Sequence, residues 1–314
     1  MALSDTRYKL NTGAEIPALG FGTWQAGPGE VSKAVYHALK SGYRHIDTAQ
    51  NYGNEAEVGE GIARAIAEGL VARSEIFVTT KLWCTYHTRV EEALNASLKR
   101  LGLDYIDLYL VHWPLAMNPN GNHDLFPKLP DGSRDLVLSH SHVTTWKSLE
   151  ELIEKNPGKV KAIGVSNYSK PYLEELLPQV KIVPAVNQIE NHPALPQQEI
   201  VDLCQEKGIL ITAYSPLGST GSPLFSADAI VEVAKRKGVS PAIVLLSWHL
   251  ARGSCVLAKS VTPSRIEENM KLAKLDQEDV DLIAKYSNEL AAKKAFQRYV
   301  YPPFGVQFGF PDKL

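Results

Sequence analysis

The chain has 314 residues, 44% of them hydrophobic and 22% charged, so it has enough apolar side chains to bury a sizeable core. Its formal net charge of −2 gives no bulk electrostatic reason to expect a nucleic-acid or membrane partner. The three cysteines are widely spaced and form no CxxC pair, which argues against a disulfide framework or a thiolate metal site. No run approaches the roughly 18 apolar residues of a membrane span, and no signal core opens the chain. We therefore expect a cytoplasmic protein; a monomer is also expected, although none of these observations determines the oligomeric state.

Short apolar runs alternate with amphipathic stretches of helical length. No linker divides the chain, so residues 1–314 are expected to form one domain. The strand-like runs are Gly20–Thr23, Arg44–Asp47, Phe77–Lys81, Asp107–His112, Ala162–Ser166, Ala185–Gln188, Leu210–Ala213 and Val256–Ala258. Helical patterns include Glu30–Ser41, Glu55–Ala67, Thr88–Leu101, His142–Lys155, Gln197–Glu206 and Pro241–Ala251. Parallel neighbours need helical crossovers, and eight such units in about 250 residues match a closed (β/α)8 barrel.

The alternative architecture is an open doubly wound sheet, which in nicotinamide enzymes usually carries GxGxxG after its first strand. The segment Thr23–Gly29 after the first predicted strand does not fit this motif, so the barrel is favoured. Two additions are expected. Tyr8–Leu10 and Ile16–Leu19 predict a β-hairpin that could plug the barrel floor. The long connection Pro114–Ser141 follows the fourth strand and would overhang the opposite, catalytic face.

Four polar side chains fall at or just beyond the carboxyl ends of the second, third and fourth strands: Asp47, Tyr52, Lys81 and His112. Active sites of barrel enzymes form at that face. A tyrosine has an ordinary pKa of about 10 and is a weak acid near neutrality, but a neighbouring ammonium favours the phenolate. Lys81 could supply that charge, Asp47 could hold Lys81, and His112 could orient a carbonyl group. Together they suit a carbonyl reductase with Tyr52 as general acid.

Each of these residues taken singly also has a structural interpretation. Lys81 and Asp47 could form an ion pair with no catalytic role, and Tyr52 could cap a loop. His112 could be a core histidine with its hydrogen bonds satisfied. Such interpretations are reasonable because titratable groups with shifted pKa values also occur in purely structural networks. The choice between these interpretations depends on the wider pattern of the sequence.

That pattern resembles the aldo-keto reductases. The matching segments are Gly20–Trp24, Gly42–Glu55, Thr80–Trp83, Leu110–Pro114, Ile163–Asn167 and Lys259–Ile266. They span almost the whole chain in the family's order, and within the family they are similar to the aldose and aldehyde reductase group, in particular to its fungal glycerol dehydrogenase and erythrose reductase branch. The resemblance implies the (β/α)8 fold, an NADPH/NADP+ cofactor and the tetrad Asp47, Tyr52, Lys81 and His112.

The resemblance also implies a cofactor site along the strand ends. Ser166, Asn167 and Gln188 would bond the nicotinamide carboxamide, and Tyr214 would stack on its ring. The other implied cofactor contacts are Thr23, Trp24, Ser215, Leu217, Ser219 and Val261. Tyr214 could instead be a core aromatic.

Lys259, Ser260, Thr262 and Arg265 follow the eighth strand, and these cations and hydroxyls near a helix start suit a phosphate. In the family this stretch holds the adenosine 2′-phosphate, with Glu268 and Asn269 on the adenine. Ala258 departs from the proline that relatives often have here, but it lies beside the site.

Aromatic residues are expected to wall the substrate pocket. Trp24, Trp83 and Trp113 follow the first, third and fourth strands, and the resemblance adds Phe126 from the long connection and the C-terminal tail around Tyr301 to Phe304. Packing at the barrel rim is the alternative explanation for the tryptophans. The tail does not match the aldose reductase pattern, so the substrate stays open. Small polyol-type aldehydes such as glyceraldehyde or erythrose are expected.

Other functions have weaker support. A cofactor-binding regulatory or scaffold protein could retain the barrel without useful catalysis, but the tetrad is complete. Gly164–Tyr168 lacks the last glycine of a GxSxG nucleophile elbow, so a serine hydrolase is not indicated. His123, His140 and His142 lie in or beside a polar loop without carboxylate or cysteine partners, and no metal site is expected there.

Overall fold

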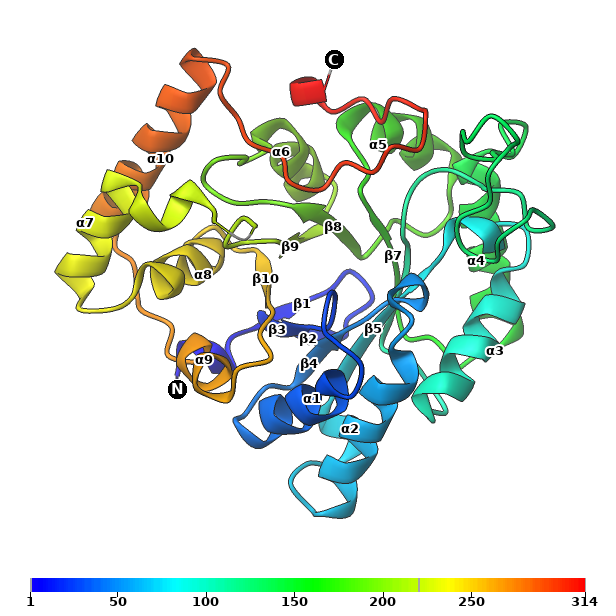
Figure 1. Cartoon of the computed structure of the whole chain (residues 1–314), viewed down its shortest axis with the longest axis horizontal. Coiled ribbons are helices and arrows are strands. Elements are labelled where there is room, and N and C mark those ends of the chain that lie inside the picture. Colours follow the sequence, from blue (N-terminus) through cyan, green and yellow to red (C-terminus); the bar gives the residue numbers. More distant parts are fainter. Residues whose placement is uncertain (1, 220, 314) are drawn as a thin grey trace.

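The computed structural model describes residues 2–219 and 221–313. Within these residues, eight parallel strands close into a barrel in the order β10-β3-β4-β5-β6-β7-β8-β9 (Figure 1). Their bounds are β3 (Leu19–Gly22), β4 (His45–Asp47), β5 (Phe77–Leu82), β6 (Leu108–Val111), β7 (Ile163–Ser166), β8 (Val186–Glu190), β9 (Leu210–Tyr214) and β10 (Cys255–Ala258). Each corresponds to a predicted strand, and pairing of β10 with both β3 and β9 closes the barrel. The predicted barrel is confirmed.

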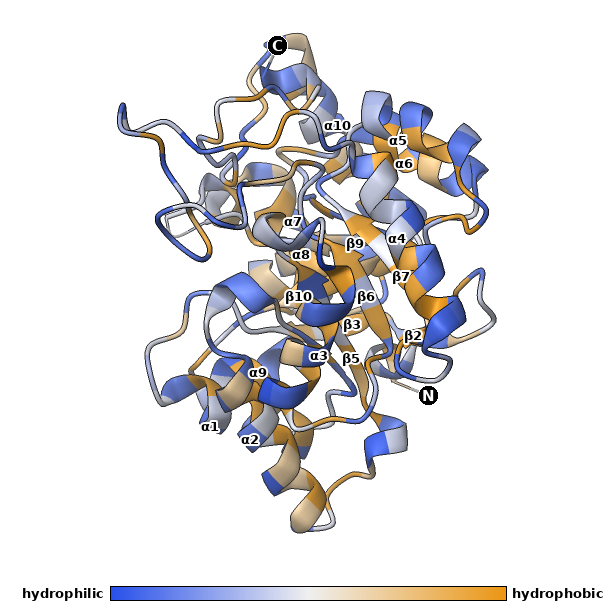
Figure 2. Ribbon diagram, turned by 90° about the vertical axis from the view of Figure 1, so that its right-hand side faces the viewer, coloured by the Kyte–Doolittle hydropathy of each residue, from blue (hydrophilic) through white to orange (hydrophobic). Residues whose placement is uncertain are grey.

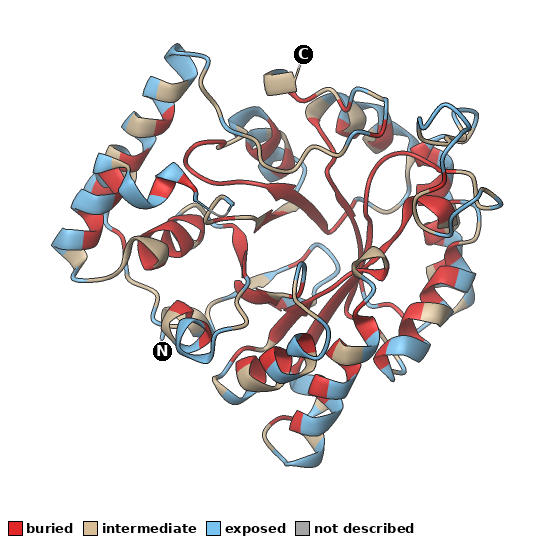
Figure 3. Ribbon diagram, in the orientation of Figure 1, coloured by how far each residue is buried: buried red, intermediate tan, exposed pale blue. Residues whose placement is uncertain are grey.

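Helices surround the barrel, so its strands are buried from inside and outside (Figure 3). Their bounds are α1 (Glu30–Lys40), α2 (Glu55–Ala67), α3 (Val90–Leu101), α4 (His142–Lys155), α5 (Lys170–Leu176), α6 (Gln198–Glu206), α7 (Asp228–Lys237), α8 (Pro241–Ala251), α9 (Pro263–Asn269) and α10 (Gln277–Ala292). Burial on both sides explains why most of these strands are rich in apolar residues, although β4, β5 and β8 also carry buried polar side chains. Apolar and polar residues alternate along most of the helices (Figure 2), and their buried residues are mainly the apolar ones, whereas α8 is apolar over most of its length.

The helix α6 begins one residue later than predicted, for a local reason. Gln197 has a φ of 44°, in the left-handed region, so it precedes α6 as its N-cap instead of forming its first residue. Short 3-10 turns complete the connections: η1 (Leu3–Asp5), η2 (Gln50–Tyr52), η3 (Arg73–Glu75), η4 (Cys84–Tyr86), η5 (Leu177–Gln179), η6 (Pro223–Ser226) and η7 (Pro311–Lys313). Of these, η2 matters most, because it carries Tyr52.

The expected N-terminal hairpin is present as β1 (Arg7–Lys9) and β2 (Glu15–Pro17), paired antiparallel. Leu19, placed in the hairpin by the sequence pattern, belongs to β3 of the barrel instead. Leu10 and Ile16 form one apolar cluster with Phe77 and Leu108, which begin β5 and β6. The hairpin therefore covers the amino-terminal end of the barrel and leaves the carboxyl end for the site.

Two segments outside the barrel unit lie at that carboxyl end. In the connection between β6 and α4, Asp124 and Leu125 are held by residues that follow β5. Trp83 Nε1 donates to Leu125 O (2.6 Å) and Thr85 Oγ1 donates to Asp124 O (2.8 Å). The second segment is the chain after α10, which crosses past α6 to α5 (Figure 1). The expected overhang of the long connection is thus anchored to the rim of the barrel.

Candidate active site

The fold brings the four expected catalytic residues to one end of neighbouring strands. Asp47 is the last residue of β4, and Tyr52 follows it in η2. Lys81 is the last residue but one of β5, and His112 comes directly after β6. Since β4, β5 and β6 are adjacent parallel strands, their carboxyl ends meet at one edge.

Lys81 connects this group. Its Nζ lies 2.6 Å from Asp47 Oδ1, donates to Thr48 O at 2.9 Å and reaches the Tyr52 hydroxyl at 3.2 Å. The Lys81 and Asp47 side chains are only 0% and 3% exposed. Buried charges are costly unless paired and hydrogen-bonded, and here both conditions are met. The pair fixes an ammonium beside the phenol.

The pKa values of these groups correct one expectation. Burial raises the pKa of Tyr52 above 10.0, and the opposing effect of the Lys81 charge is smaller. Burial lowers the pKa of Lys81, but the charge of Asp47 and the bonds to Asp47 and Tyr52 raise it by more, so it lies above 10.5. From the sequence, the neighbouring Lys81 ammonium is expected to favour the phenolate and so to lower the pKa of Tyr52. Desolvation outweighs that ammonium, so Tyr52 holds its proton and Lys81 its charge near neutrality.

His112 is a buried, neutral imidazole. Burial lowers its pKa well below 6.5, and the positive charge of Lys81 lowers it further. Its ring stands edge-on to Tyr52, with centroids 5.8 Å apart, and to Trp83 at 5.2 Å. Its Nδ1 is buried without a hydrogen-bond partner among the described residues. A neutral ring beside the phenol can offer a hydrogen bond to a ligand oxygen without adding charge.

A second polar network continues from the tetrad into β7, β8 and β9. Gln188 Nε2 donates to Asp47 Oδ2 (2.8 Å), and Asn167 Nδ2 donates to His112 O (2.9 Å). Ser166 Oγ donates to the Gln188 carbonyl (2.8 Å), and the Tyr214 hydroxyl donates to Asn167 Oδ1 (2.7 Å). These four expected cofactor residues therefore lie together, in hydrogen-bonding continuity with the tetrad.

Backbone strain gathers at the same face. Gln25, Asn167 and Ser215, at or just beyond the carboxyl ends of β3, β7 and β9, have φ values of 56°, 62° and 49°. Such conformations are uncommon for residues with a Cβ and cluster at functional sites. Thr23, also after β3, donates from Oγ1 to Asp47 O (3.0 Å).

The predicted phosphate residues lie after β10. Lys259 Nζ donates to Gln25 O (2.7 Å), joining this segment to the loop after β3, and burial lowers the Lys259 pKa. Ser260 Oγ accepts the Thr262 N–H at 3.0 Å. Arg265 is exposed; its backbone N–H donates to Thr262 O at 3.1 Å, and its guanidinium has no hydrogen bond to the other expected phosphate residues within the described chain. The helix α9 has only seven residues, so the two cations and the hydroxyls are the main anion-binding groups.

These residues fit NADP(H) by the chemistry of their donor sets. One end offers hydroxyl and amide groups and the Tyr214 ring, as a nicotinamide needs. The other end offers two cations and hydroxyls, as a phosphate needs. Of the other expected cofactor residues, Ser215, Leu217 and Ser219 lie in the chain between these two groups, and Val261 lies within the second group. In α9, Glu268 is half-buried and Asn269 is buried.

An aromatic wall borders the tetrad. Trp24 is 42% exposed and its ring lies 6.5 Å from that of Tyr52. The ring centroid of Trp83 lies 5.2 Å from that of Phe126 and 6.2 Å from that of Phe304. The ring centroids of Trp113 and Phe304 are 5.7 Å apart. The long connection, through Phe126, and the C-terminal tail, through Phe304, thus contact the tryptophans, and their part in a substrate pocket stays a prediction.

Two tail residues differ from the expectation. Sequence reasoning missed Phe308, whose ring lies 5.0 Å from Trp113. Tyr301 instead bonds Gln307 and packs on Phe308 at 5.9 Å, one layer further out. The position of Phe308, six residues before the chain end, carried no sequence signal for this contact.

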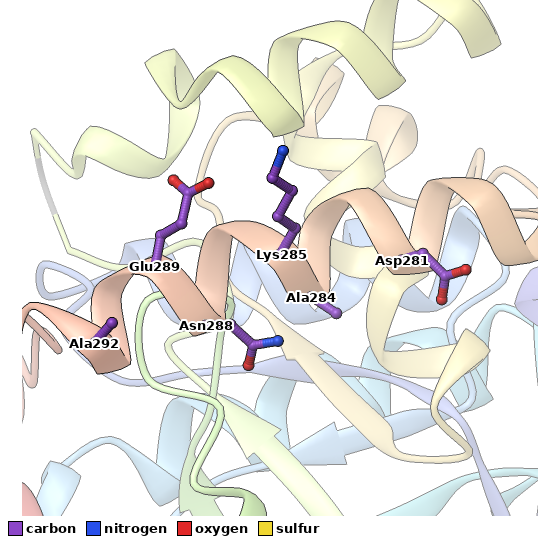
Figure 4. A pocket seen from close by; sticks show the side chains of 6 residues that line it. All are labelled: Asp281, Ala284, Lys285, Asn288, Glu289 and Ala292. Atoms are coloured by element: carbon purple, nitrogen blue, oxygen red, sulfur yellow. The ribbon is translucent and has the colours of Figure 1, made fainter.

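Surface hollows lie elsewhere. One of about 490 Å³ is lined by side chains of α10 alone, so a single helix cannot enclose a ligand there (Figure 4). Another, of about 430 Å³, lies on the long connection and includes Phe126 but no tetrad member. Among the described residues no helix has the length and apolarity needed to cross a bilayer.

The three histidines weighed as metal ligands have other contacts. His123 Nδ1 accepts the N–H groups of Leu125 and Phe126, both at 3.0 Å. His140 Nε2 lies 3.0 Å from Thr145 Oγ1, and His142 packs on Tyr168 with centroids 5.4 Å apart. They shape the long connection and its junction with α4.

A closed parallel barrel with a buried Asp–Lys–Tyr group at its carboxyl end is the arrangement expected of an aldo-keto reductase. The model of the aldo/keto reductase family matches residues 18–288, and the chain belongs to this family. It is 62% identical to D-galacturonate reductase of Hypocrea jecorina over 98% of this chain and 99% of that protein. It is 49% identical to glycerol 2-dehydrogenase (NADP(+)) of Saccharomyces cerevisiae, with 95% of each chain covered.

Among solved structures, the aldose reductase of Schistosoma japonicum matches with a TM-score of 0.89. It is 38% identical, and the match covers 98% of this chain and 100% of that one. The chain is thus a carbonyl-reducing oxidoreductase that uses NADP(H). The resemblance seen in the sequence, including the fungal branch, is confirmed.

Proposed function

We propose that this protein reduces aldehydes and ketones to alcohols reversibly, with Tyr52 as the general acid. The observation that carries the proposal is the buried contact of Lys81 with both Asp47 and the Tyr52 hydroxyl. NADPH, when bound, supplies the hydride. The chain's own residues then have to deliver one proton to the carbonyl oxygen and hold that oxygen in place.

Tyr52 delivers the proton from its hydroxyl. Burial keeps that hydroxyl protonated at neutral pH, since it raises the Tyr52 pKa. As the proton leaves, negative charge develops on the phenolic oxygen, 3.2 Å from Lys81 Nζ. The ammonium stabilises this charge, which is absent in the ground state, and so acts mainly on the transition state. Asp47 keeps Lys81 in position from its other side.

His112 positions the carbonyl oxygen. Its low pKa keeps the ring neutral, so it donates a hydrogen bond without competing with Tyr52 as an acid. The Asn167 bond to the His112 carbonyl ties this backbone to the expected nicotinamide site. In this proposal Ser166, Asn167, Gln188 and Tyr214 hold the nicotinamide, and Lys259, Ser260 and Arg265 hold the 2′-phosphate.

The substrates in this proposal are small polyhydroxy aldehydes. The names of the two fungal relatives refer to a sugar acid and to glycerol, which supports this class. The aromatic wall of Trp24, Trp83 and Trp113 supports it in a second way, because it excludes water beside the reacting carbon. The whole chain is taken as one barrel domain, acting as a cytoplasmic monomer.

A substrate panel tests the proposal. NADPH oxidation would be followed by absorbance with glyceraldehyde, erythrose, D-galacturonate, dihydroxyacetone and an aromatic aldehyde, and compared as kcat/KM. The hydroxyaldehydes should lead. Faster reduction of bulky aromatic carbonyls would overturn the substrate class. NADPH binding without turnover of any carbonyl would overturn the reductase itself and favour a cofactor-binding regulatory protein.

A further inference from the structure

Glu190 is a fully buried carboxylate at the carboxyl end of β8. Its side chain is 0% exposed. It lies two residues beyond Gln188, so both point to the same side of the strand. Gln188 donates a hydrogen bond to Asp47 of the tetrad, whereas no side-chain hydrogen bond or ion pair joins Glu190 to the tetrad among the described residues. The proposed mechanism leaves this carboxylate without a role.

Two partners of the Glu190 side chain come from the C-terminal tail, and a third, His192, lies just after β8. Its Oε1 accepts the Tyr299 N–H at 2.7 Å, and its Oε2 accepts the Val300 N–H at 2.8 Å. His192 Nε2 lies 3.1 Å from Oε1, within hydrogen-bond distance. Both oxygens are therefore occupied, and the tail backbone is held at two successive residues.

The residue before Tyr299, Arg298, joins this tail to a residue near its other end, Asp312. Arg298 Nε and Nη2 donate to the two oxygens of Asp312, at 2.8 and 2.7 Å, and the Arg298 side chain is 1% exposed. The guanidinium also lies 4.0 Å from the centroid of the Phe310 ring. A bidentate pair of this kind fixes orientation as well as distance. Residues 298–312 thus form a loop whose base is fastened by Glu190 and by Asp312.

That loop carries the rings that complete the substrate wall. Phe304 contacts both Trp83 and Trp113, Phe308 contacts Trp113, and both phenylalanines are buried. The loop itself contains no helix or strand before η7. Without regular hydrogen bonding of its own, its position depends on the fastenings at its base.

We propose that Glu190 is a specificity-determining positioning residue: by fixing the tail backbone at Tyr299 and Val300, it sets how closely Phe304 and Phe308 approach the tryptophans. It thereby limits the size of carbonyl compound that reaches Tyr52. This inference rests on the proposed function, because it takes the aromatic wall as the substrate pocket.

Glu190→Gln tests the inference with little change in volume. An amide has only one acceptor oxygen, so its NH2 group would face a backbone N–H of the tail, donor against donor. We expect the ratio of kcat/KM for benzaldehyde to that for glyceraldehyde to rise about tenfold, mainly through a lower KM for benzaldehyde. Asp312→Asn, at the other fastening, should shift the ratio in the same direction. Glu206→Gln, an exposed glutamate on α6, is the matched control and should leave it unchanged.

Trypsin cleavage after Arg298 supplies a readout independent of activity. The buried Arg298 should be protected in the native enzyme, and the fragment beginning at Tyr299 should form at least about tenfold faster in Glu190→Gln. A lower melting temperature with an unchanged substrate ratio and unchanged cleavage would overturn the proposal and leave Glu190 a purely structural residue. A native enzyme that reduces no aldehyde would refute the proposed function alone, since the cleavage test would still report on the fastening.

Discussion

Lys81 Nζ and Asp47 Oδ1 lie 2.6 Å apart in an environment that excludes water from both side chains. Such a pair adds little net stability, because desolvation of the two charges offsets their attraction. What the pair does is hold the Lys81 ammonium beside a third group, the Tyr52 hydroxyl. In the proposed mechanism, Tyr52 therefore depends on a charge that the fold holds where the solvent cannot screen it.

Replacing Lys81 by methionine should lower kcat by at least about a hundredfold, since the phenol loses the charge that stabilises its conjugate base. It should also destabilise the fold by about 3–5 kcal/mol, because Asp47 is left buried and unpaired. Asp47→Asn alone should lower kcat by less than Lys81→Met, because Asp47 orients Lys81 without touching the substrate. The double variant Asp47→Asn/Lys81→Met should regain most of the stability but none of the activity. Urea unfolding and steady-state kinetics would separate the two effects, and recovery of activity in the double variant would contradict the role of Lys81.

Arg265→Ala should weaken NADPH binding about ten- to a hundredfold, since it removes a charge-assisted contact with the 2′-phosphate. NADH binding should change by less than about twofold. Fluorescence titration with both cofactors checks this, and Lys235→Ala, an exposed lysine on α7, is the control. An equal loss for NADPH and NADH would show that Arg265 does not contact the 2′-phosphate.

Trp24→Ala should raise KM for small aldehydes and lower kcat/KM by about five- to thirtyfold, as expected for losing about 1–2 kcal/mol of apolar contact. Trp24 is already 42% exposed, so the fold should tolerate the change. Val231→Ala, on the exposed face of α7, offers a control. If NADPH affinity fell as much as kcat/KM, Trp24 would belong to the cofactor site rather than to the substrate wall.

The buried His45 predicts an acid-sensitive barrel. Burial lowers its pKa to about 4, and its ring nitrogens lie 3.3 Å from Pro17 O and 3.0 Å from Thr79 Oγ1. A depressed pKa gives stability that is present above the unfolded pKa of 6.5 and is lost as pH falls toward 4. The free energy of unfolding should drop by about 2 kcal/mol from this residue between pH 7.5 and pH 5. His45→Gln should lose that part of the pH dependence, and an unchanged profile would exclude His45 as its source.

The sequence predicted all eight barrel strands, because most are short runs rich in apolar residues that end in or just before a polar residue. It also placed Asp47, Tyr52, Lys81 and His112 at one end, since parallel strands share their carboxyl edge. Contacts between segments distant in the chain were beyond its reach. The tail fastening at Glu190 joins residues 109 and 110 positions apart.

The net shift of the Tyr52 pKa was also inaccessible from the sequence. A sequence shows which charges are neighbours in the predicted topology, but the balance between Lys81 and desolvation depends on how densely the side chains pack. The same limit applies to Phe308, whose place against Trp113 follows from the path of a loop without regular structure.

The central claim is that Tyr52 protonates the carbonyl oxygen, and single-turnover oxidation of enzyme-bound NADPH by glyceraldehyde tests it most directly in Tyr52→Phe. The change removes one hydroxyl, so the fold and the NADPH dissociation constant should be retained. The rate of NADPH oxidation should fall by at least about a hundredfold, the lower range of general acid catalysis. A Tyr52→Phe enzyme that binds NADPH normally and oxidises it near the native rate would contradict the mechanism.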